Sequence, residues 1–100
     1  MRHIKFLIGR IEAIGNCEAL VGGRCCGEEI RRGDRTTVMT KSDGVQEIMR
    51  RDLTIIFHTI RAYDRDIEVL SRGMTAGIIV PDTLAEELLL NWALEGDCDE

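Results

Sequence analysis

The sequence has one proline, four aromatic residues and no long apolar run. No stretch approaches the ~20 apolar residues of a membrane-spanning helix, so we expect no membrane protein. Charges at Arg2 and Lys5 interrupt the N-terminal segment too early for the apolar core of a signal peptide, and we expect a cytoplasmic protein. Ten glycines spread along the chain predict many turns rather than a low-complexity linker.

The length and the apolar content fit one small globular domain. The chain has 100 residues, of which 44% are hydrophobic, a share close to the globular norm. One hundred residues leave room for a single hydrophobic core. The same composition argues against a disordered chain, because disordered segments have a low apolar content.

Charge is unevenly distributed along the chain. Residues 1–72 carry all 13 lysine and arginine side chains and 11 of the 18 acidic ones, a net charge of +2. Residues 73–100 carry seven acids and no base, so the net charge of the whole chain is −5. This balance is unlike that of a plain nucleic-acid binder, which carries a basic excess overall. Arginine outnumbers lysine eleven to two, and its planar guanidinium favours two-pronged hydrogen bonding.

Residue types that bind metals or catalyse reactions show no spacing that supports either role. No two cysteines have the C-x₂₋₄-C spacing of a zinc site and the two histidines lie far apart, so we predict reduced thiols, no metal and no cofactor. His58 lacks a nearby nucleophile with an orienting carboxylate, which predicts a structural histidine and no catalytic residue. The cysteines are Cys17, Cys25, Cys26 and Cys98.

Five segments rich in β-forming residues predict strands separated by glycine turns. Large apolar groups of the fourth segment point to both faces, so we expect a central or covered strand there. The pair Gly22–Gly23 in the second segment predicts a bend or a close backbone approach. Short strands without long helical patterns between them predict a closed barrel or a sandwich. The segments are residues 4–14, 17–26, 36–40, 53–62 and 75–80.

A C-terminal helix is predicted after the last strand, over residues 81–95. Pro81 ends the strand pattern, and Thr83 followed three residues later by Glu86 fits a capping box. Residues 96–100 are predicted as an acidic tail. The single domain therefore divides into strands over residues 1–80, this helix and the tail.

The predicted helix has an apolar half that we expect to pack on the strands. Leu90 and Leu94 fall on the opposite half, among polar residues, and form a small apolar stripe. Such a stripe is either a protein contact, often self-association, or a covered and inert surface.

An ordered series of glycines links the predicted strands: Gly23-Arg24, Gly27, Ile30 and Gly33-Asp34, with Arg72-Gly73 farther along the chain. This series resembles the second domain of translational GTPases of the elongation-factor type. That domain has a strand ending in Gly-Arg, a glycine turn, an apolar residue and Gly-Asp before the next strand. The resemblance covers residues 4–80 and implies a closed antiparallel β-barrel, so the fold class that we expect is all-β with a C-terminal helix.

The chemistry of turns agrees with that fold. Gly27 and Gly33 can take a positive φ where a loop reverses, and Asp34 can hydrogen-bond the turn backbone. Gly23 and Gly73 are predicted as further structural turn positions. The chain has no G-x-x-x-x-G-K-[ST] phosphate loop, so the resemblance implies a barrel without its GTPase domain, and we expect no nucleotide hydrolysis.

Five arginines flank the predicted loops, and barrel closure would gather them into an anion-binding patch. In the family the second domain contacts RNA and the aminoacyl end of tRNA, so the resemblance implies a role in contacting phosphates. Solvated loop charges are the other interpretation, because the C-terminal segment is acidic and few aromatic residues are present to stack on bases. The arginines are Arg31, Arg32, Arg35, Arg50 and Arg51.

Two hypotheses on function follow. The first is a non-catalytic protein-interaction or self-association module that uses the barrel face and the C-terminal helix, with Leu90 and Leu94 at the interface. The alternative is an RNA- or ribosome-associated module that uses the arginine loops. An enzyme lacks any supporting set of residues in this sequence.

Overall fold

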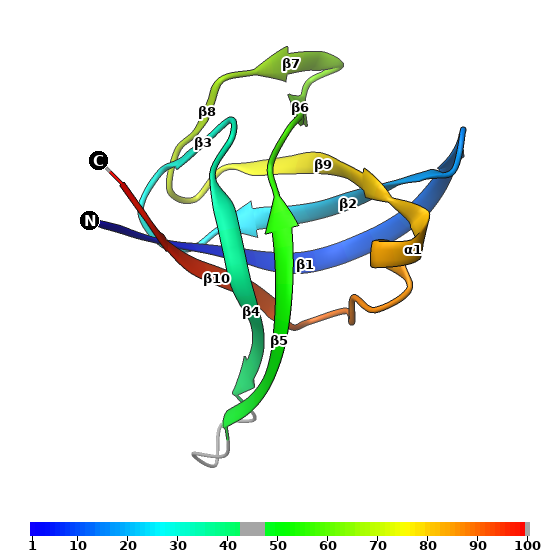
Figure 1. The fold of residues 1–100 in the computed structure, drawn as a ribbon. Helices are drawn as coiled ribbons and strands as arrows, with labels where there is room; N and C mark the ends of the chain where they lie inside the picture. Colours follow the sequence, from blue (N-terminus) through cyan, green and yellow to red (C-terminus); the bar gives the residue numbers. More distant parts are fainter. Residues whose placement is uncertain (43–47, 100) are drawn as a thin grey trace.

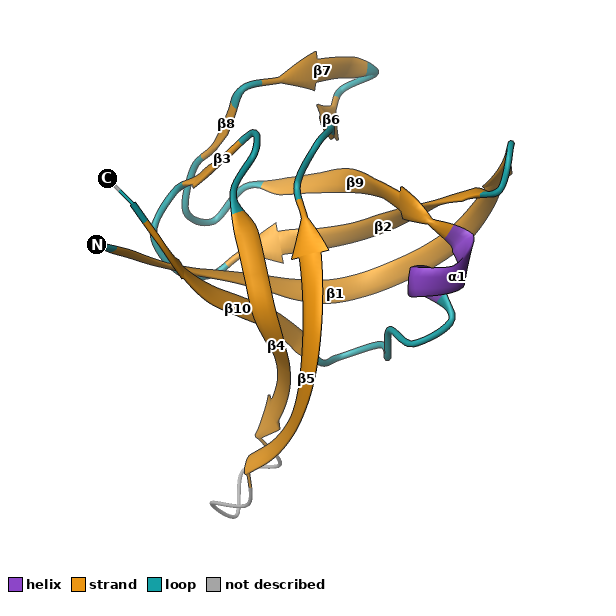
Figure 2. Cartoon of the chain, in the orientation of Figure 1, coloured by secondary structure: helices purple, strands orange, loops and turns teal. Residues whose placement is uncertain are grey.

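The computed structural model describes residues 1–42 and 48–99, and most of these residues are in β-strands (Figure 1, Figure 2). The expected all-β class is confirmed. The elements are β1 (Arg2–Gly15), β2 (Glu18–Cys25), β3 (Ile30–Arg31), β4 (Arg35–Ser42), β5 (Ile48–Ile56), β6 (Ile60–Ala62), β7 (Arg65–Ile67), β8 (Val69–Leu70), β9 (Thr75–Pro81), α1 (Asp82–Ala85) and β10 (Ala93–Cys98).

Eight strands form one antiparallel sheet in the order β5-β4-β10-β1-β2-β9-β6-β7, and β3 pairs with β8 in a second sheet. The large sheet bends, so that β4 and β5 run across the direction of β1, β2 and β9 (Figure 1). β5 and β7 stand at its two ends, and within residues 1–42 and 48–99 no ladder joins these ends. The sheet is therefore not closed into the expected barrel.

The predicted strand over residues 53–62 is broken in the middle, between β5 and β6. β5 ends at Ile56 and lies at the sheet edge rather than at its centre. The backbone N–H of Phe57 donates to Asp34 and its carbonyl accepts from Gly33, both at 2.8 Å. After these two hydrogen bonds the chain crosses from β5 at one end of the sheet to β6 near the other.

One hydrophobic core lies between the two parts of the bent sheet. Alternate residues of β1 point into it, and Ile4, Phe6 and Ile8 are each 0% exposed. The ring of Phe6 meets the ring of Phe57 edge-to-face, with centroids 5.6 Å apart and planes at 88°. The N-terminal strand is thereby packed against the chain that follows β5.

The predicted helix over residues 81–95 is wrong beyond its first turn. α1 spans only Asp82–Ala85, and β10 occupies residues 93–98, where the end of the helix and the acidic tail were expected. β10 pairs with β1 on one side and β4 on the other. The apolar period of this segment favours a helix locally, but two ladders and burial between neighbouring strands outweigh that preference. In the described chain, no helix has the length and apolar character needed to cross a membrane.

The predicted apolar stripe is likewise divided. Leu94 is 0% exposed because it lies in β10 opposite Phe6 of β1, so its assignment to a protein interface is wrong. Leu90 precedes β10 and is 52% exposed. The chain turns between them at Asn91, which has a φ of 70°.

The glycines predicted as turn positions fall into two kinds, and Gly23 is not a turn position because it lies inside β2. Gly33 and Gly73 have φ values of 95° and 88°, a conformation that L side chains rarely adopt, which confirms them as turn positions. Gly27 does not have a positive φ; a Cβ there would lie 2.8 Å from the carbonyl oxygen of His3, so a close approach to β1 requires it. Asp34 accepts the N–H of Arg31 at 2.7 Å, as predicted for the turn.

Candidate binding groove on the outer face of the sheet

The five arginines predicted to form one patch lie in two separate places. Arg31, Arg32 and Arg35 flank the β3–β4 turn. Arg50 and Arg51 lie in β5. In the β4–β5 ladder Arg50 is opposite Thr40, five positions along β4 from Arg35. Five residues of strand span about 17 Å. The structure therefore does not bring the two groups together.

Most of these arginines already contact oxygen atoms of the chain. Exposed pairs of this kind contribute little to stability, but they reduce the charge left for an external anion. The ion pairs are Arg31–Glu29 at 2.9 Å, Arg32–Glu68 at 3.1 Å and Arg50–Asp52 at 3.6 Å. Arg51 donates to the carbonyl oxygen of Glu87 at 3.3 Å.

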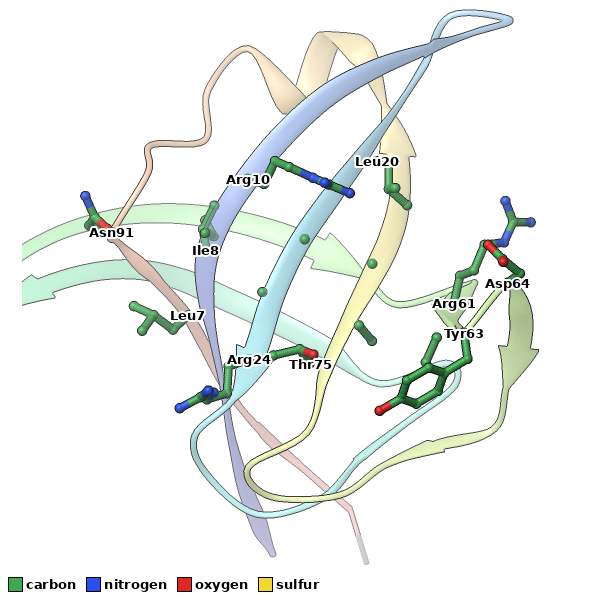
Figure 3. Close-up of a pocket in the computed structure, with 16 residues that line it drawn as sticks. Leu7, Ile8, Arg10, Leu20, Arg24, Arg61, Tyr63, Asp64, Thr75 and Asn91 are labelled. Atoms are coloured by element: carbon green, nitrogen blue, oxygen red, sulfur yellow. The ribbon is translucent and has the colours of Figure 1, made fainter.

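A groove of about 620 Å³ lies elsewhere, on the face of β1, β2 and β9 that is turned away from the core (Figure 3). Glycines form its floor. Gly22 of β2 is opposite Gly77 of β9, and Gly9 lies in β1 where the ladder is irregular between Ile8 and Arg10. Because these positions lack side chains, side chains from neighbouring positions can lie over this row of the outer surface.

Side chains from four strands and a hairpin surround the glycine floor. Leu20 lies over Gly77, since a Cβ on that glycine would be 2.6 Å from a methyl carbon of Leu20. Arg10 lies over Gly22, and Figure 3 shows its side chain extending across β2. Arg61 lies in β6, which pairs with β9 on the side away from β2, and it is opposite Gly77 in that pairing.

The charges that line the groove are mainly positive. They comprise three guanidinium groups, of Arg10, Arg24 and Arg61, and one carboxylate, of Asp64. Nε of Arg10 is 3.7 Å from the carboxylate of Glu12, and Nε of Arg61 is 3.1 Å from that of Asp66. Arg24 has no carboxylate within 4 Å in the part of the chain that the structure describes. Because Arg10 and Arg61 have carboxylate partners, Arg24 is the guanidinium of the groove that lacks one in the described chain.

One wall of the groove is the β6–β7 hairpin. Ala62 is opposite Arg65, so the hairpin has a two-residue turn, and its two turn residues, Tyr63 and Asp64, have φ values of 54° and 63°. Positive φ at both positions is the geometry of a type I′ turn. The turn presents Tyr63 with 87% of its surface exposed. Across the floor Leu7 is 40% exposed, so the groove has apolar as well as cationic walls.

Sequence reasoning did not find this groove. The pair Gly22–Gly23 was predicted to allow a close approach, but the role of Gly22 depends on its register with Gly77. The available signal was the alternation of Leu20, Gly22 and Arg24, which places all three on one face of a strand. That signal does not show which face is buried.

A second cluster of titratable groups ties the first and last strands together. The ring nitrogens of His3 lie 2.9 Å from Glu95 and 2.8 Å from Asp97. The hydrogen bond between the ring and the carboxylate of Glu95 has the largest effect on the pKa of His3, followed by the hydrogen bond with Asp97. Together they raise this pKa above 6.5. Burial raises the pKa of Glu95, but hydrogen bonds from Thr40 and His3 bring it below 4.5 overall. The backbone N–H of His3 donates to Glu28 at 2.7 Å.

We expect this cluster to make the fold more stable in mild acid than in mild base. A raised histidine pKa contributes stability that is fully present below 6.5 and is lost as the pH rises through the folded value. Urea unfolding measured at about pH 5.5 and pH 8.5 should give the higher midpoint at the lower pH. The variant His3→Gln should remove most of this difference, and an unchanged difference in that variant would contradict the assignment.

The other residue types considered for catalysis or metal binding are the cysteines and His58. All four cysteines have free thiols, and burial raises the pKa of the Cys25 thiol. His58 is exposed in the link between β5 and β6. Across residues 1–42 and 48–99, no group of three or more His, Cys, Asp or Glu side chains is arranged to hold a metal ion. The comparison of the sequence with models of protein families and with curated proteins found no significant match.

Proposed function

We propose that this chain is a non-catalytic protein-interaction module whose outer groove binds an extended segment of a partner protein. The groove on β1, β2 and β9 carries the proposal, because its glycine row holds only the side chains of Arg10 and Leu20, and an extended segment could lie on them between the walls. The exposed Tyr63 and Leu7 supply apolar contact on either side. Aromatic anchors of this kind dominate the energy of many interfaces.

The other hypotheses have less support. Self-association through the stripe of Leu90 and Leu94 has less support, because Leu94 is buried and only Leu90 is exposed. RNA or ribosome binding through the loop arginines lacks a common site, because Arg35 and Arg50 lie far apart on the β4–β5 hairpin. The resemblance of residues 4–80 to the second domain of translational GTPases is compatible with a β-rich binding domain that lacks a phosphate loop.

The groove is tested by the substitution Gly22→Val. A Cβ at this position would meet the Cβ of Arg10 at 3.6 Å, an ordinary contact, and the γ-methyl groups of valine would extend from there into the groove. Peptides selected from a random displayed library on the unmodified protein should bind Gly22→Val at least tenfold more weakly. Affinity is measured by titration calorimetry.

The matched control is Thr54→Val, an apolar substitution at an exposed position of β5, outside the groove. It should leave the affinity of the selected peptides unchanged. Equal binding by the unmodified protein and Gly22→Val would show that the peptides bind elsewhere, and the groove would no longer be the site.

A further inference from the structure

We infer that the segment bound in the groove is acidic, with two carboxylates that alternate along an extended chain beside an apolar residue. This inference rests on the proposed function and adds the chemistry of the partner. Charge complementarity is the first reason. Of the three guanidinium groups that line the groove, Arg61 is paired with Asp66 at 3.1 Å and Arg10 is 3.7 Å from Glu12. Arg24 has no carboxylate partner in the described chain, so it is the cation that an acidic segment would meet first.

The uneven charge favours a short acidic segment over a long polyanion. The whole chain has a net charge of −5, so a long polyanion is repelled more strongly overall than a short acidic peptide. A short peptide places its carboxylates only where the arginines are. The groove also offers a single aromatic side chain, Tyr63, which is a small stacking surface for successive bases.

The spacing of the arginines sets the spacing of the acids. Arg10 is opposite Gly22 on the neighbouring strand, and Arg24 lies two residues beyond Gly22 on the same face. Neighbouring strands are about 4.8 Å apart and two residues of strand span about 6.7 Å, which places the two Cα atoms about 8 Å apart. Alternate side chains of an extended segment lie about 7 Å apart on one face. The Cα atoms of Arg10 and Arg24 are therefore about as far apart as acids at positions i and i+2 of an extended segment.

The two arginines are suited to this role in different ways. Arg24 has no carboxylate within 4 Å in the described chain and is exposed, so its guanidinium has its donors available for a bidentate pair. Arg10 is 3.7 Å from Glu12, a long and exposed pair that an incoming carboxylate can replace. Apolar residues next to the acids would contact Leu7 and Tyr63, which flank the arginines in Figure 3.

The test compares two labelled peptides, Leu-Ser-Asp-Ser-Asp-Ser-Leu and the same peptide with asparagine at both acidic positions. Fluorescence anisotropy should show at least about tenfold tighter binding of the acidic peptide, since charge-assisted bidentate pairs are the strong ones. Arg24→Gln should remove most of this preference and leave the affinity for the asparagine peptide unchanged. The matched control Arg32→Gln, at an exposed arginine outside the groove, should bind as the unmodified protein does.

Each other outcome identifies which idea fails. If the unmodified protein binds both peptides equally and Gly22→Val binds neither, the acidic preference is wrong but the groove remains the binding site. Acidic-peptide binding that Gly22→Val leaves unchanged would overturn the proposed function as well. No binding of the acidic peptide at about 1 mM, a weak limit for any interface, would overturn the inference. Tighter binding of an oligouridylate of about eight nucleotides would assign the groove to RNA instead.

Discussion

Replacing Arg2 with methionine is expected to lower the free energy of unfolding by about 3–5 kcal/mol, the usual cost of breaking a buried ion pair. The Arg2 and Asp34 side chains are only 7% and 11% exposed. Nη1 of Arg2 donates to Oδ2 of Asp34 at 2.7 Å, and Nη2 donates to Oδ1 at 2.9 Å. The same guanidinium donates to the carbonyl oxygens of Glu29 and Asp99. Methionine fills much of the volume but leaves a buried carboxylate without its cation.

The position of this pair in the fold explains why the effect should be global. Arg2 begins β1, Asp34 ends the β3–β4 turn and Asp99 follows β10, so one side chain joins three distant parts of the chain. Urea unfolding at neutral pH measures the loss. Arg32→Met removes an exposed pair with Glu68 and should cost less than about 1 kcal/mol. Similar losses in the two variants would contradict a special role for Arg2.

The acid limb of the stability curve gives a second measurement of the same pair. Burial raises the pKa of Asp34, but hydrogen bonds from Arg2 and from the Arg31 N–H bring it below 3.8 overall. A lowered carboxyl pKa contributes stability that is present above 3.8 and is lost as the pH falls through the folded value. The difference between the unmodified protein and Arg2→Met should therefore shrink as the pH falls below about 3.8.

Local patterns in the sequence predicted strands that contain a run of β-forming residues, and residues 75–80 correspond to β9 although its partner β2 is distant in the chain. Residues 4–14 and 17–26 are rich in β-forming residues and are joined by a short turn, and they correspond to β1 and β2. The turn at Gly33 and Asp34 was also predictable, because positive φ and side-chain hydrogen bonding are local properties. Each of these features needs information from only a few consecutive residues.

The features that were not predicted depend on residues far apart in the chain. β10 has a helical apolar period, and only its place between β1 and β4 makes it a strand. Phe57 belongs to a continuous apolar run, and only its hydrogen bonds with the distant turn at residues 33–34 divide that run. The groove also needs a pairing between residues 55 positions apart, Gly22 and Gly77. Such pairings are set by the register of the sheet rather than by local preference.

Two adjacent glycines in β2 are expected to respond oppositely to the same substitution. Neither has a positive φ, so conformational strain does not distinguish them. They differ in the face on which a side chain would lie, because successive residues of a strand point to opposite faces. Gly22 faces the groove, whereas Gly23 faces the core under the ring of Phe6.

Gly23→Ala is expected to lower the free energy of unfolding by about 3 kcal/mol, at the upper end for an overpacked core. The new methyl group would lie 2.6 Å from a ring carbon of Phe6 and would also collide with the backbone oxygen of Leu7. The backbone oxygen belongs to the β1–β2 ladder and cannot move without breaking the pairing. The ring is held against Phe57, so it cannot move freely either.

Gly22→Ala is the matched control for Gly23→Ala, because it adds the same methyl group one residue away. Its Cβ would meet Arg10 at 3.6 Å, and replacing a strand glycine by alanine at a compatible site stabilises by about 0.4–1 kcal/mol. Thermal unfolding of both variants should therefore give midpoints on opposite sides of that of the unmodified protein. A common shift of both midpoints would show that β2 does not present Gly22 and Gly23 to opposite faces, and the register that forms the groove floor would be wrong.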